Sequence, residues 1–324
     1  RLEEEKQRQQ KLGKTMIDFS IGSPDIAPAR HIIDALCTEV AKPENYRYAI
    51  HDLPQLQTAI AAWYERRYQV SLDGQKEILT LQGSQEALAN IALTICDPGD
   101  YVLVPDPYYP IFADGPRLAG AKVWFMPMRE ENDFLIRFDE IPQEIAEKAS
   151  LMIVSYPNNP TGATADDRFY EELIAFARRY DIAVLHDNAY SELVFDGPLG
   201  KSFLSYPGAK DVGVELNSFS KTYGMAGARL GVLVGNAQLI EGYKILKSNM
   251  DYGIFLPIQK AGVVALNENQ NCVETTRQTY IAVISWCAVF RRPDGRFVPT
   301  GRRCSYGRAS HRDMRTVRHL HLRF

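Results

Sequence analysis

The 324-residue sequence lacks the long apolar runs that membrane proteins need. No uninterrupted stretch reaches the about 18 apolar residues of a membrane span, so we expect no transmembrane helix. Residues 1–14 are polar and charged and have no apolar core, which argues against a secretory signal. The first residue is not methionine, which suggests a fragment or a trimmed chain. We therefore expect a cytoplasmic protein that does not bind membranes.

Cysteine is also scarce. There are five cysteines, an odd number, and no two of them have the spacing of a CxxC pair. Such scattered residues are typical of free, reduced thiols in a cytoplasmic protein. We also expect no metal site. The five positions are Cys37, Cys96, Cys272, Cys287 and Cys304.

A strong surplus of basic charge, typical of nucleic-acid-binding proteins, is missing as well. The net charge is −3, with 45% hydrophobic and 24% charged residues, which excludes a disordered or collagen-like chain. This average combines two different parts. Residues 291–324 hold ten Arg, no Lys and two Asp, a net charge of +8, whereas the other 290 residues carry −11. Since this basic tail shows neither helical nor strand periodicity, we expect it to be disordered. No interleaved aromatic residues or known module accompany its arginines, so we expect it not to bind nucleic acid.

Helix-like and strand-like segments alternate along the remaining sequence. Such alternation indicates an α/β fold with a mainly parallel sheet flanked by helices. At about 150 residues per domain, the length suggests two domains. The apolar spacing predicts helices at 53–68, 85–95, 169–180, 237–249, 257–266 and 272–289. Strands are predicted at 77–81, 101–104, 122–126, 151–155, 182–186, 212–217 and 230–234.

Polar and aromatic residues follow five of these predicted strands. In open parallel sheets, ligands bind beyond the carboxyl ends of the strands. One such cluster could be an ordinary turn, but five along one edge predict a ligand site. The clusters are residues 83–85, 108–109, 158–162, 187–190 and 218–221.

Lys221 and Arg229 give the strongest chemical signal. A lysine at a strand end among small hydroxyl residues can form a Schiff base with an aldehyde when it is desolvated. Arg229, eight residues further on, is a candidate for bidentate phosphate binding. Ser84 and Gln85 open a predicted helix whose N–H groups favour an anion, although Ser84 is equally well an ordinary N-cap. A surface lysine and a structural arginine are the alternative.

Asp187 ends an apolar strand, so we expect a partly buried carboxylate that needs a partner. A protonated pyridine nitrogen would serve, and this pairing makes a pyridoxal ring an electron sink. Tyr190 and Asn159 could donate to the phenolate oxygen of that ring, and Tyr109 could stack on its face. A turn role for Asp187 and a packing role for Tyr109 are the alternatives. The neighbouring His186 is interpreted as a core histidine.

Residues 218–231, Ser-Phe-Ser-Lys-Thr-Tyr-Gly-Met-Ala-Gly-Ala-Arg-Leu-Gly, resemble the lysine segment of the class I/II aminotransferases. These are pyridoxal-phosphate enzymes of fold type I. Residues 159–162 (Asn-Pro-Thr-Gly) and 187–190 (Asp-Asn-Ala-Tyr) resemble two further signatures in the same order. The resemblance covers about residues 15–285 and is greatest to prokaryotic aspartate-type and diaminopimelate-type enzymes. It implies pyridoxal phosphate as cofactor and an amino acid and a 2-oxo acid as substrates.

The resemblance also implies roles for individual residues. Lys221 would hold the cofactor and move the substrate proton, and Asp187 would pair with the pyridine nitrogen. Gly22 would lie near the substrate carboxylate. Tyr48 would reach the cofactor phosphate of the partner subunit, since the family forms homodimers with shared sites, although the usual Gly is missing from residues 51–53. The other cofactor-binding residues would be Tyr190 and Asn159 at the phenolate, Tyr109 on the ring, and Ser84, Gln85, Ser218 and Arg229 at the phosphate.

The domain organisation follows from the same resemblance. Residues 1–45 would form an N-terminal arm and part of a small domain, 46–271 the cofactor-binding large domain, and 272–290 a linking helix. Members of the family continue beyond that helix to complete the small domain, which carries an arginine for the substrate carboxylate. Residues 291–324 hold no family motif and look like out-of-frame translation, which predicts an incomplete small domain. A lyase or decarboxylase of the same fold and an inactive, cofactor-binding product are the alternatives to an aminotransferase.

Overall fold

The computed structural model describes residues 2–14, 22, 24–195 and 197–289. The chain divides into two compact units, Pro24–Arg277 and a second formed by Arg1–Ser23 with Gln278–Phe324. The second unit contains helix α1 (Leu2–Lys11) and the last turns of α13 (Asn271–Val289). The predicted disorder of residues 291–324 lies outside the described residues. The domain boundaries predicted after residues 45 and 271 stay predictions.

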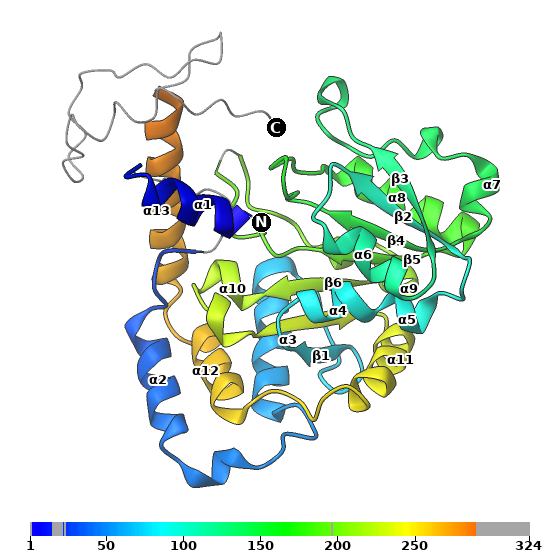
Figure 1. Ribbon diagram of the computed structural model, residues 1–324. Helices are drawn as coiled ribbons and strands as arrows, with labels where there is room; N and C mark the ends of the chain where they lie inside the picture. Colours follow the sequence, from blue (N-terminus) through cyan, green and yellow to red (C-terminus); the bar gives the residue numbers. More distant parts are fainter. Residues whose placement is uncertain (1, 15–21, 23, 196, 290–324) are drawn as a thin grey trace. The chain divides into compact units, whose positions relative to one another are not determined.

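The larger unit is built around a mixed sheet (Figure 1). In the described residues this sheet has seven strands in the order β1-β7-β6-β5-β4-β2-β3. The neighbours from β3 to β6 are parallel, and β7 runs antiparallel to both β6 and β1. The predicted α/β fold with a mainly parallel sheet is therefore confirmed. The strands are β1 (Ile78–Leu81), β2 (Tyr101–Asp106), β3 (Lys122–Pro127), β4 (Ala149–Ser155), β5 (Ala183–Asp187), β6 (Gly213–Ser218) and β7 (Gly231–Gly235).

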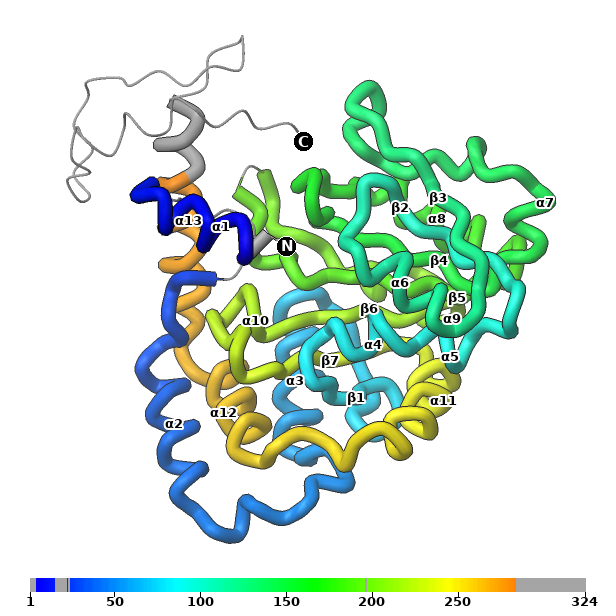
Figure 2. The backbone as a smooth tube through the Cα atoms, viewed as in Figure 1, coloured from blue at the N-terminus to red at the C-terminus, as the bar shows by residue number. Residues whose placement is uncertain are grey.

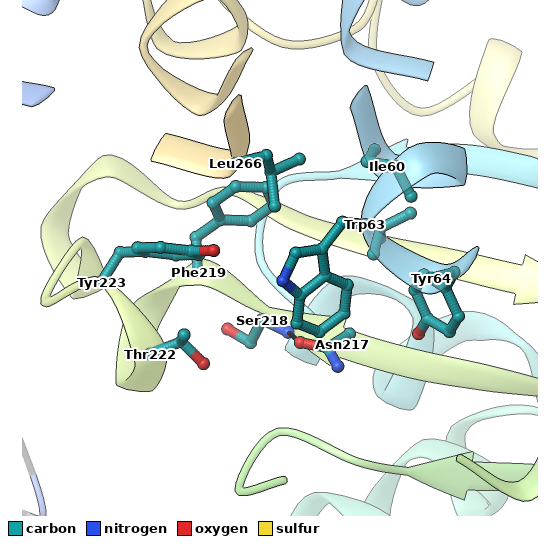
Figure 3. Close-up of a pocket in the computed structure, with 10 residues that line it drawn as sticks. Ile60, Trp63, Tyr64, Asn217, Ser218, Phe219, Thr222, Tyr223 and Leu266 are labelled. Carbon is teal, nitrogen blue, oxygen red and sulfur yellow. Dashed lines mark hydrogen bonds between the residues drawn. The ribbon is translucent and has the colours of Figure 1, made fainter. Parts of the chain in front are cut away.

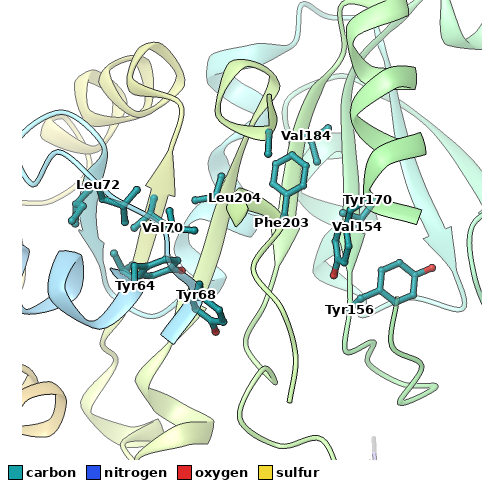
Figure 4. Close-up of a cluster of buried hydrophobic side chains, with 14 of the residues drawn as sticks. Tyr64, Tyr68, Val70, Leu72, Val154, Tyr156, Tyr170, Val184, Phe203 and Leu204 are labelled. Atoms are coloured by element: carbon teal, nitrogen blue, oxygen red, sulfur yellow. The ribbon is translucent and has the colours of Figure 1, made fainter. Parts of the chain in front are cut away.

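Helices cover both faces of the sheet, because both sets of alternating strand side chains are apolar. Leu151 and Ile153 of β4 belong to one buried cluster, and Met152 and Val154 belong to the other. Figure 4 shows part of the second cluster. Its helices are α2 (Arg30–Val40), α3 (Pro54–Tyr68), α8 (Asp167–Tyr180) and α12 (Leu256–Asn267), and the opposite face is covered by α4 (Gln85–Asn90), α5 (Ala92–Ile95), α6 (Ile111–Leu118) and α11 (Ala237–Ser248).

Short elements complete the chain between these layers. Several of them turn the chain directly after a strand, as α10 does after β6. They are the α-helices α7 (Gln143–Ala146), α9 (Ala209–Val212) and α10 (Phe219–Thr222), with the 3₁₀ helices η1 (Pro43–Tyr46), η2 (Glu130–Asn132), η3 (Phe138–Glu140), η4 (Phe203–Ser205) and η5 (Ala226–Ala228).

The helix predicted over residues 85–95 is wrong in its length. It is two short helices, α4 and α5, that meet at Ile91. The side chain of Asn90 donates to the Glu86 carbonyl over 2.8 Å, a local hydrogen bond that competes with regular helix geometry. Helix α6 was not predicted, because it contains Gly115 and Pro116, two residue types that disfavour the interior of a helix. Gly115 is needed there, since a Cβ would lie 2.4 Å from the Leu88 carbonyl oxygen.

Three further expectations concern the cysteines, membrane-spanning helices and metal sites. Cys37, Cys96 and Cys272 are free thiols, as predicted, whereas Cys287 and Cys304 lie outside the described side chains. Within the described ranges, no helix has the length and apolarity to cross a bilayer. The same residues contain no group of three or more His, Cys, Asp or Glu side chains arranged to hold a metal ion.

Candidate functional site

The carboxyl ends of three neighbouring strands bring the predicted clusters together. Strands β4, β5 and β6 are neighbours in the sheet (Figure 1). Ser155 at the end of β4 pairs in register with Asp187 at the end of β5, and Asp187 pairs with Leu216 of β6. Because parallel strands end at the same edge, the loops that follow them leave the sheet side by side. These loops carry residues 158–162, 187–190 and 218–221.

Two more clusters join this edge. Ser218 pairs with Gly231 of β7, and Gly231 pairs with Leu81 at the end of β1. The turn after β1 therefore lies beside the lysine segment. The Tyr109 hydroxyl donates to Gln85 Oε1 over 3.1 Å, which connects the loop after β2 to the same turn. The strand pairing and this hydrogen bond thus place all five predicted clusters at one edge of the sheet.

Lys221 lies on α10, and Ser218 begins this short helix by accepting a hydrogen bond from the Ser220 N–H over 3.2 Å. The Lys221 Nζ lies 5.7 Å from the centroid of the Tyr190 ring. Burial lowers the pKa of Lys221, and the nearby Asp187 opposes this shift. A larger fraction of the amine is therefore neutral and nucleophilic than in a solvated lysine.

Tyr190 and Asn159 meet above the end of the sheet. The Asn159 Nδ2 lies 3.5 Å from the Tyr190 hydroxyl, at the limit of a hydrogen bond. Burial raises the pKa of Tyr190 to about 12, and the Asp187 carboxylate adds to this rise. The phenol is therefore protonated at neutral pH and can donate a hydrogen bond to an oxyanion.

Asp187 is buried, as predicted, with 6% of the residue exposed. Its Oδ1 accepts the Ala189 N–H over 3.3 Å. Burial raises the pKa of Asp187 to about 6, and the Ala189 hydrogen bond offsets only part of that effect. A buried carboxylate in this condition would be stabilised by a cationic partner on the ligand side.

Arg229 lies against the turn that follows β1. At Gly83, with φ of +78°, a Cβ would lie 2.1 Å from Arg229 Nη2, so the guanidinium packs directly against a glycine whose backbone conformation other residues rarely adopt. At Gly231 a Cβ would lie 2.6 Å from the Ser84 backbone nitrogen. Arg229 itself is exposed and adopts a left-handed backbone with φ of 55°, a strained conformation for a residue other than glycine. The backbone around Ser84 and a guanidinium are thus held together, as an anion site requires.

For two of the predicted site residues, Tyr48 and Gly22, the predicted roles stay predictions. Tyr48 is 76% exposed, and its ring contacts Tyr252, with 5.1 Å between the ring centroids. Gly22 belongs to the smaller unit, so its predicted place at a substrate carboxylate stays a prediction.

A buried polar cluster behind Asp187 was only partly recognised from the sequence. His186 is confirmed as a core histidine, since it is fully buried and its Nδ1 lies 2.9 Å from Glu215 Oε2. Glu215, on β6, also accepts hydrogen bonds from Tyr64 over 3.0 Å and from the Phe203 N–H over 2.8 Å. The sequence signal for this cluster was a lone glutamate within an apolar strand, a position that requires buried partners.

We predict that His186→Phe lowers the stability of the protein but does not abolish covalent attachment of the cofactor. Phenylalanine preserves the ring contacts to Tyr170 and Phe203 but leaves Glu215 without one of its buried partners. The loss is expected to be about 1–3 kcal/mol, measured by urea unfolding of the cofactor-free protein. If stability were unchanged while covalent cofactor attachment disappeared, the core assignment of His186 would be wrong.

A small cavity lies behind the lysine segment (Figure 3). Its volume is about 10 Å³, enough for a single water molecule and too small for a cofactor. Trp63 and Tyr64 from α3 and Asn217 from β6 line it, and the Asn217 Nδ2 has no hydrogen-bond partner among the described residues.

Comparison with known proteins agrees with this geometry. The family model "Aminotransferase class I and II" matches residues 14–286. The LL-diaminopimelate aminotransferase of Moorella thermoacetica is 47% identical over 269 residues, 83% of this chain and 69% of that protein. The glutamate-pyruvate aminotransferase AlaC of Escherichia coli is 41% identical over 269 residues, which are 83% of this chain and 65% of AlaC.

Solved structures give the same result. A probable N-succinyldiaminopimelate aminotransferase from Thermus thermophilus superimposes with a TM-score of 0.84 at 35% identity, covering 88% of this chain and 77% of that one. Substrate-bound BacF from Bacillus subtilis superimposes with a TM-score of 0.84 at 36% identity, covering 88% and 72% of the two chains.

Proposed function

The chain belongs to the class I and II aminotransferases, enzymes that move an amino group between an amino acid and a 2-oxo acid, and we propose that its amino donor is LL-diaminopimelate. The observation that carries this substrate is the 47% identity over 83% of the chain to an enzyme with that name. A lyase or decarboxylase activity gains no support from the relatives described above, since these are named as aminotransferases.

We propose pyridoxal phosphate as the cofactor, because the family uses it and the residues at the sheet edge fit its functional groups. Asp187 offers a buried carboxylate for a ring nitrogen, Lys221 an amine for the aldehyde, and Arg229 a cation for the phosphate. When bound, the cofactor supplies an electron sink for the pair released at the substrate Cα. Orienting the cofactor, moving the substrate proton and stabilising the charge of the ring would be tasks of side chains of the protein.

Lys221 would have two tasks in this site. Its Nζ would hold the cofactor aldehyde covalently and, once a substrate amine has taken its place, would carry the proton from the substrate Cα. Burial favours both tasks, because it lowers the pKa of Lys221 and keeps more of the amine in the form that attacks and accepts protons. Asp187 would keep the ring nitrogen protonated and so stabilise the negative charge that develops in the ring.

The other residues would orient the cofactor. Tyr190 and Asn159 would donate to its phenolate oxygen, in agreement with their contact at 3.5 Å. Tyr109 would stack on the ring, a position that its hydrogen bond to Gln85 supports. At the phosphate we propose a cradle formed by Ser84, Gln85, Ser218 and Arg229.

We further propose a homodimer in which Tyr48 reaches the cofactor phosphate of the partner subunit. An exposed aromatic and aliphatic patch supports this interface, since exposed groups of large apolar side chains mark association surfaces. Tyr48 and Tyr252 are both exposed, and their rings contact each other. The patch also includes the exposed residues Val40, Tyr46, Ile50, Met250 and Phe255. Gly22 keeps its proposed place near the substrate carboxylate.

The proposed donor is tested with the full chain loaded with pyridoxal phosphate. LL-diaminopimelate, L-glutamate and L-alanine are each mixed with the protein, and loss of the absorbance of the bound aldehyde form is followed in a single turnover. We expect LL-diaminopimelate to react fastest. A faster reaction with L-glutamate or L-alanine would instead favour the activity for which AlaC is named, at 41% identity.

A further inference from the structure

A buried lysine outside the proposed site lies between two segments that contribute to that site. Lys247, on α11, is 5% exposed. Its Nζ lies 2.9 Å from Glu86 Oε2 and 2.8 Å from Asp251 Oδ2. An ammonium group is stable in such surroundings only when it is paired with carboxylates, and removing the lysine charge would leave two neighbouring carboxylates without their shared counter-charge. The lysine therefore holds both carboxylates in fixed positions.

The Glu86 side of this contact controls the turn of the proposed phosphate cradle. The same Glu86 Oε2 accepts the Gln82 N–H over 2.6 Å, and Oε1 accepts the Tyr243 hydroxyl over 3.2 Å. Glu86 thus closes the turn that contains Ser84 and Gln85 by binding the backbone just before it. The conformation of the cradle depends on where this carboxylate is held.

The Asp251 side controls the segment that carries Tyr48. Asp251 Oδ1 accepts the Gly253 N–H over 2.8 Å. At Gly253, with φ of +88°, a Cβ would lie 2.0 Å from the Ala49 carbonyl oxygen, so the two backbones are in direct contact. Figure 2 shows the connection between α11 and α12 running beside the segment that leads from η1 to α3. The Tyr48 and Tyr252 rings pack together at this crossing.

We propose that Lys247 is a positioning residue for phosphate recognition. It fixes the distance between the turn that binds the phosphate of its own subunit and the segment that presents Tyr48 to the phosphate of the partner. This inference rests on the proposed function, because it takes Ser84, Gln85 and Tyr48 as phosphate-binding residues. It predicts that removing the Lys247 charge weakens the binding of a ligand that carries the phosphate group and leaves the binding of the same ring without phosphate almost unchanged.

The test compares pyridoxal phosphate with pyridoxal, which lacks the phosphate. Lys247→Met keeps the length of the side chain and removes its charge. Equilibrium titration should show about tenfold weaker binding of pyridoxal phosphate, the size expected for losing a charged hydrogen bond, with little change for pyridoxal. Should Lys247→Met fail to fold, Glu86→Gln is the second variant, because it preserves the shape of the side chain. Its affinity for pyridoxal phosphate should fall less than in Lys247→Met, again with little change in the affinity for pyridoxal.

Lys210→Met is the matched control. The Lys210 Nζ also bridges two oxygens, Glu77 Oε2 at 2.8 Å and the Ser71 carbonyl at 2.6 Å, but it does not contact the cradle turn. It should leave both affinities unchanged. Equal losses for the two ligands, or no loss in either Lys247→Met or Glu86→Gln, would overturn the positioning role. Failure of the wild-type chain to bind either ligand would instead contradict the proposed function itself.

Discussion

Lys221→Ala is expected to abolish the covalent attachment of pyridoxal phosphate and to lower transamination by at least about 10²–10⁴-fold, the contribution of one positioned proton-transfer group. The substitution removes the amine whose pKa burial lowers, and with it both the group that attacks the aldehyde and the group that moves the substrate proton. Attachment is measured by borohydride reduction followed by peptide mass spectrometry, and activity by turnover with excess cofactor.

The structure offers a matched control for Lys221. Lys122 also places its Nζ beside a tyrosine ring, at 5.6 Å from the Tyr101 centroid, but it is exposed at the start of β3. Lys122→Ala should leave attachment and turnover unchanged, because this exposed lysine lies at the amino end of a parallel strand, at the opposite edge of the sheet from Lys221. If the reduced adduct were found on another lysine, or persisted in Lys221→Ala, the assignment of Lys221 would be wrong.

The strands and the site edge could be predicted because their signals are local. Every predicted strand occurs in the described residues, with ends shifted by no more than two positions. A short apolar run followed by polar residues predicts both the strand and its exposed end, so Asp187 and Lys221 could be found from the sequence. Helix α2 was not predicted, although Ile32, Ile33 and Leu36 have helical spacing, because Ala29 at its N-cap and the lack of an acidic residue in its first turn give no start signal.

The contacts behind the site could not be predicted, because they join residues far apart in the chain. Glu215 meets Tyr64 and His186 only through the order of the strands and the packing of α3. Lys247 and Glu86 are separated by 161 positions, and no local sequence pattern relates them. In the linear sequence nothing next to these residues identifies their partners. Only the three-dimensional arrangement identifies the partner.

Asp187→Asn should lower the turnover of the enzyme and raise the stability of the cofactor-free protein. With cofactor bound, the variant loses the charge that pairs with the ring nitrogen, and breaking a buried charge pair costs about 3–5 kcal/mol. We therefore expect turnover to fall by about 10²–10⁴-fold. Asparagine retains an oxygen for the Ala189 N–H, so the local backbone should persist. Activity is measured with saturating cofactor, so that weaker binding is not mistaken for slower chemistry.

The stability effect has a definite direction with pH. Burial raises the pKa of Asp187 from 3.8 to about 6, so the folded, cofactor-free protein binds this proton more tightly than the unfolded chain does. Its contribution to stability is present below pH 4 and is lost as the pH rises to 6 and above. At pH 8 the variant should therefore be more stable than the wild type, by up to about 3 kcal/mol, and the gain should disappear below pH 4.

Asp211→Asn separates this effect from a general loss of negative charge. Asp211 is an exposed carboxylate whose side chain is 71% accessible and is paired with Arg178. Because solvent screens such a pair, its substitution should change neither turnover nor the pH dependence of unfolding. If Asp187→Asn stabilised the protein equally at all pH values, desolvation of the carboxylate would not be the cause. If it also left turnover intact, Asp187 would not be the partner of the ring nitrogen, and the buried carboxylate would need another explanation.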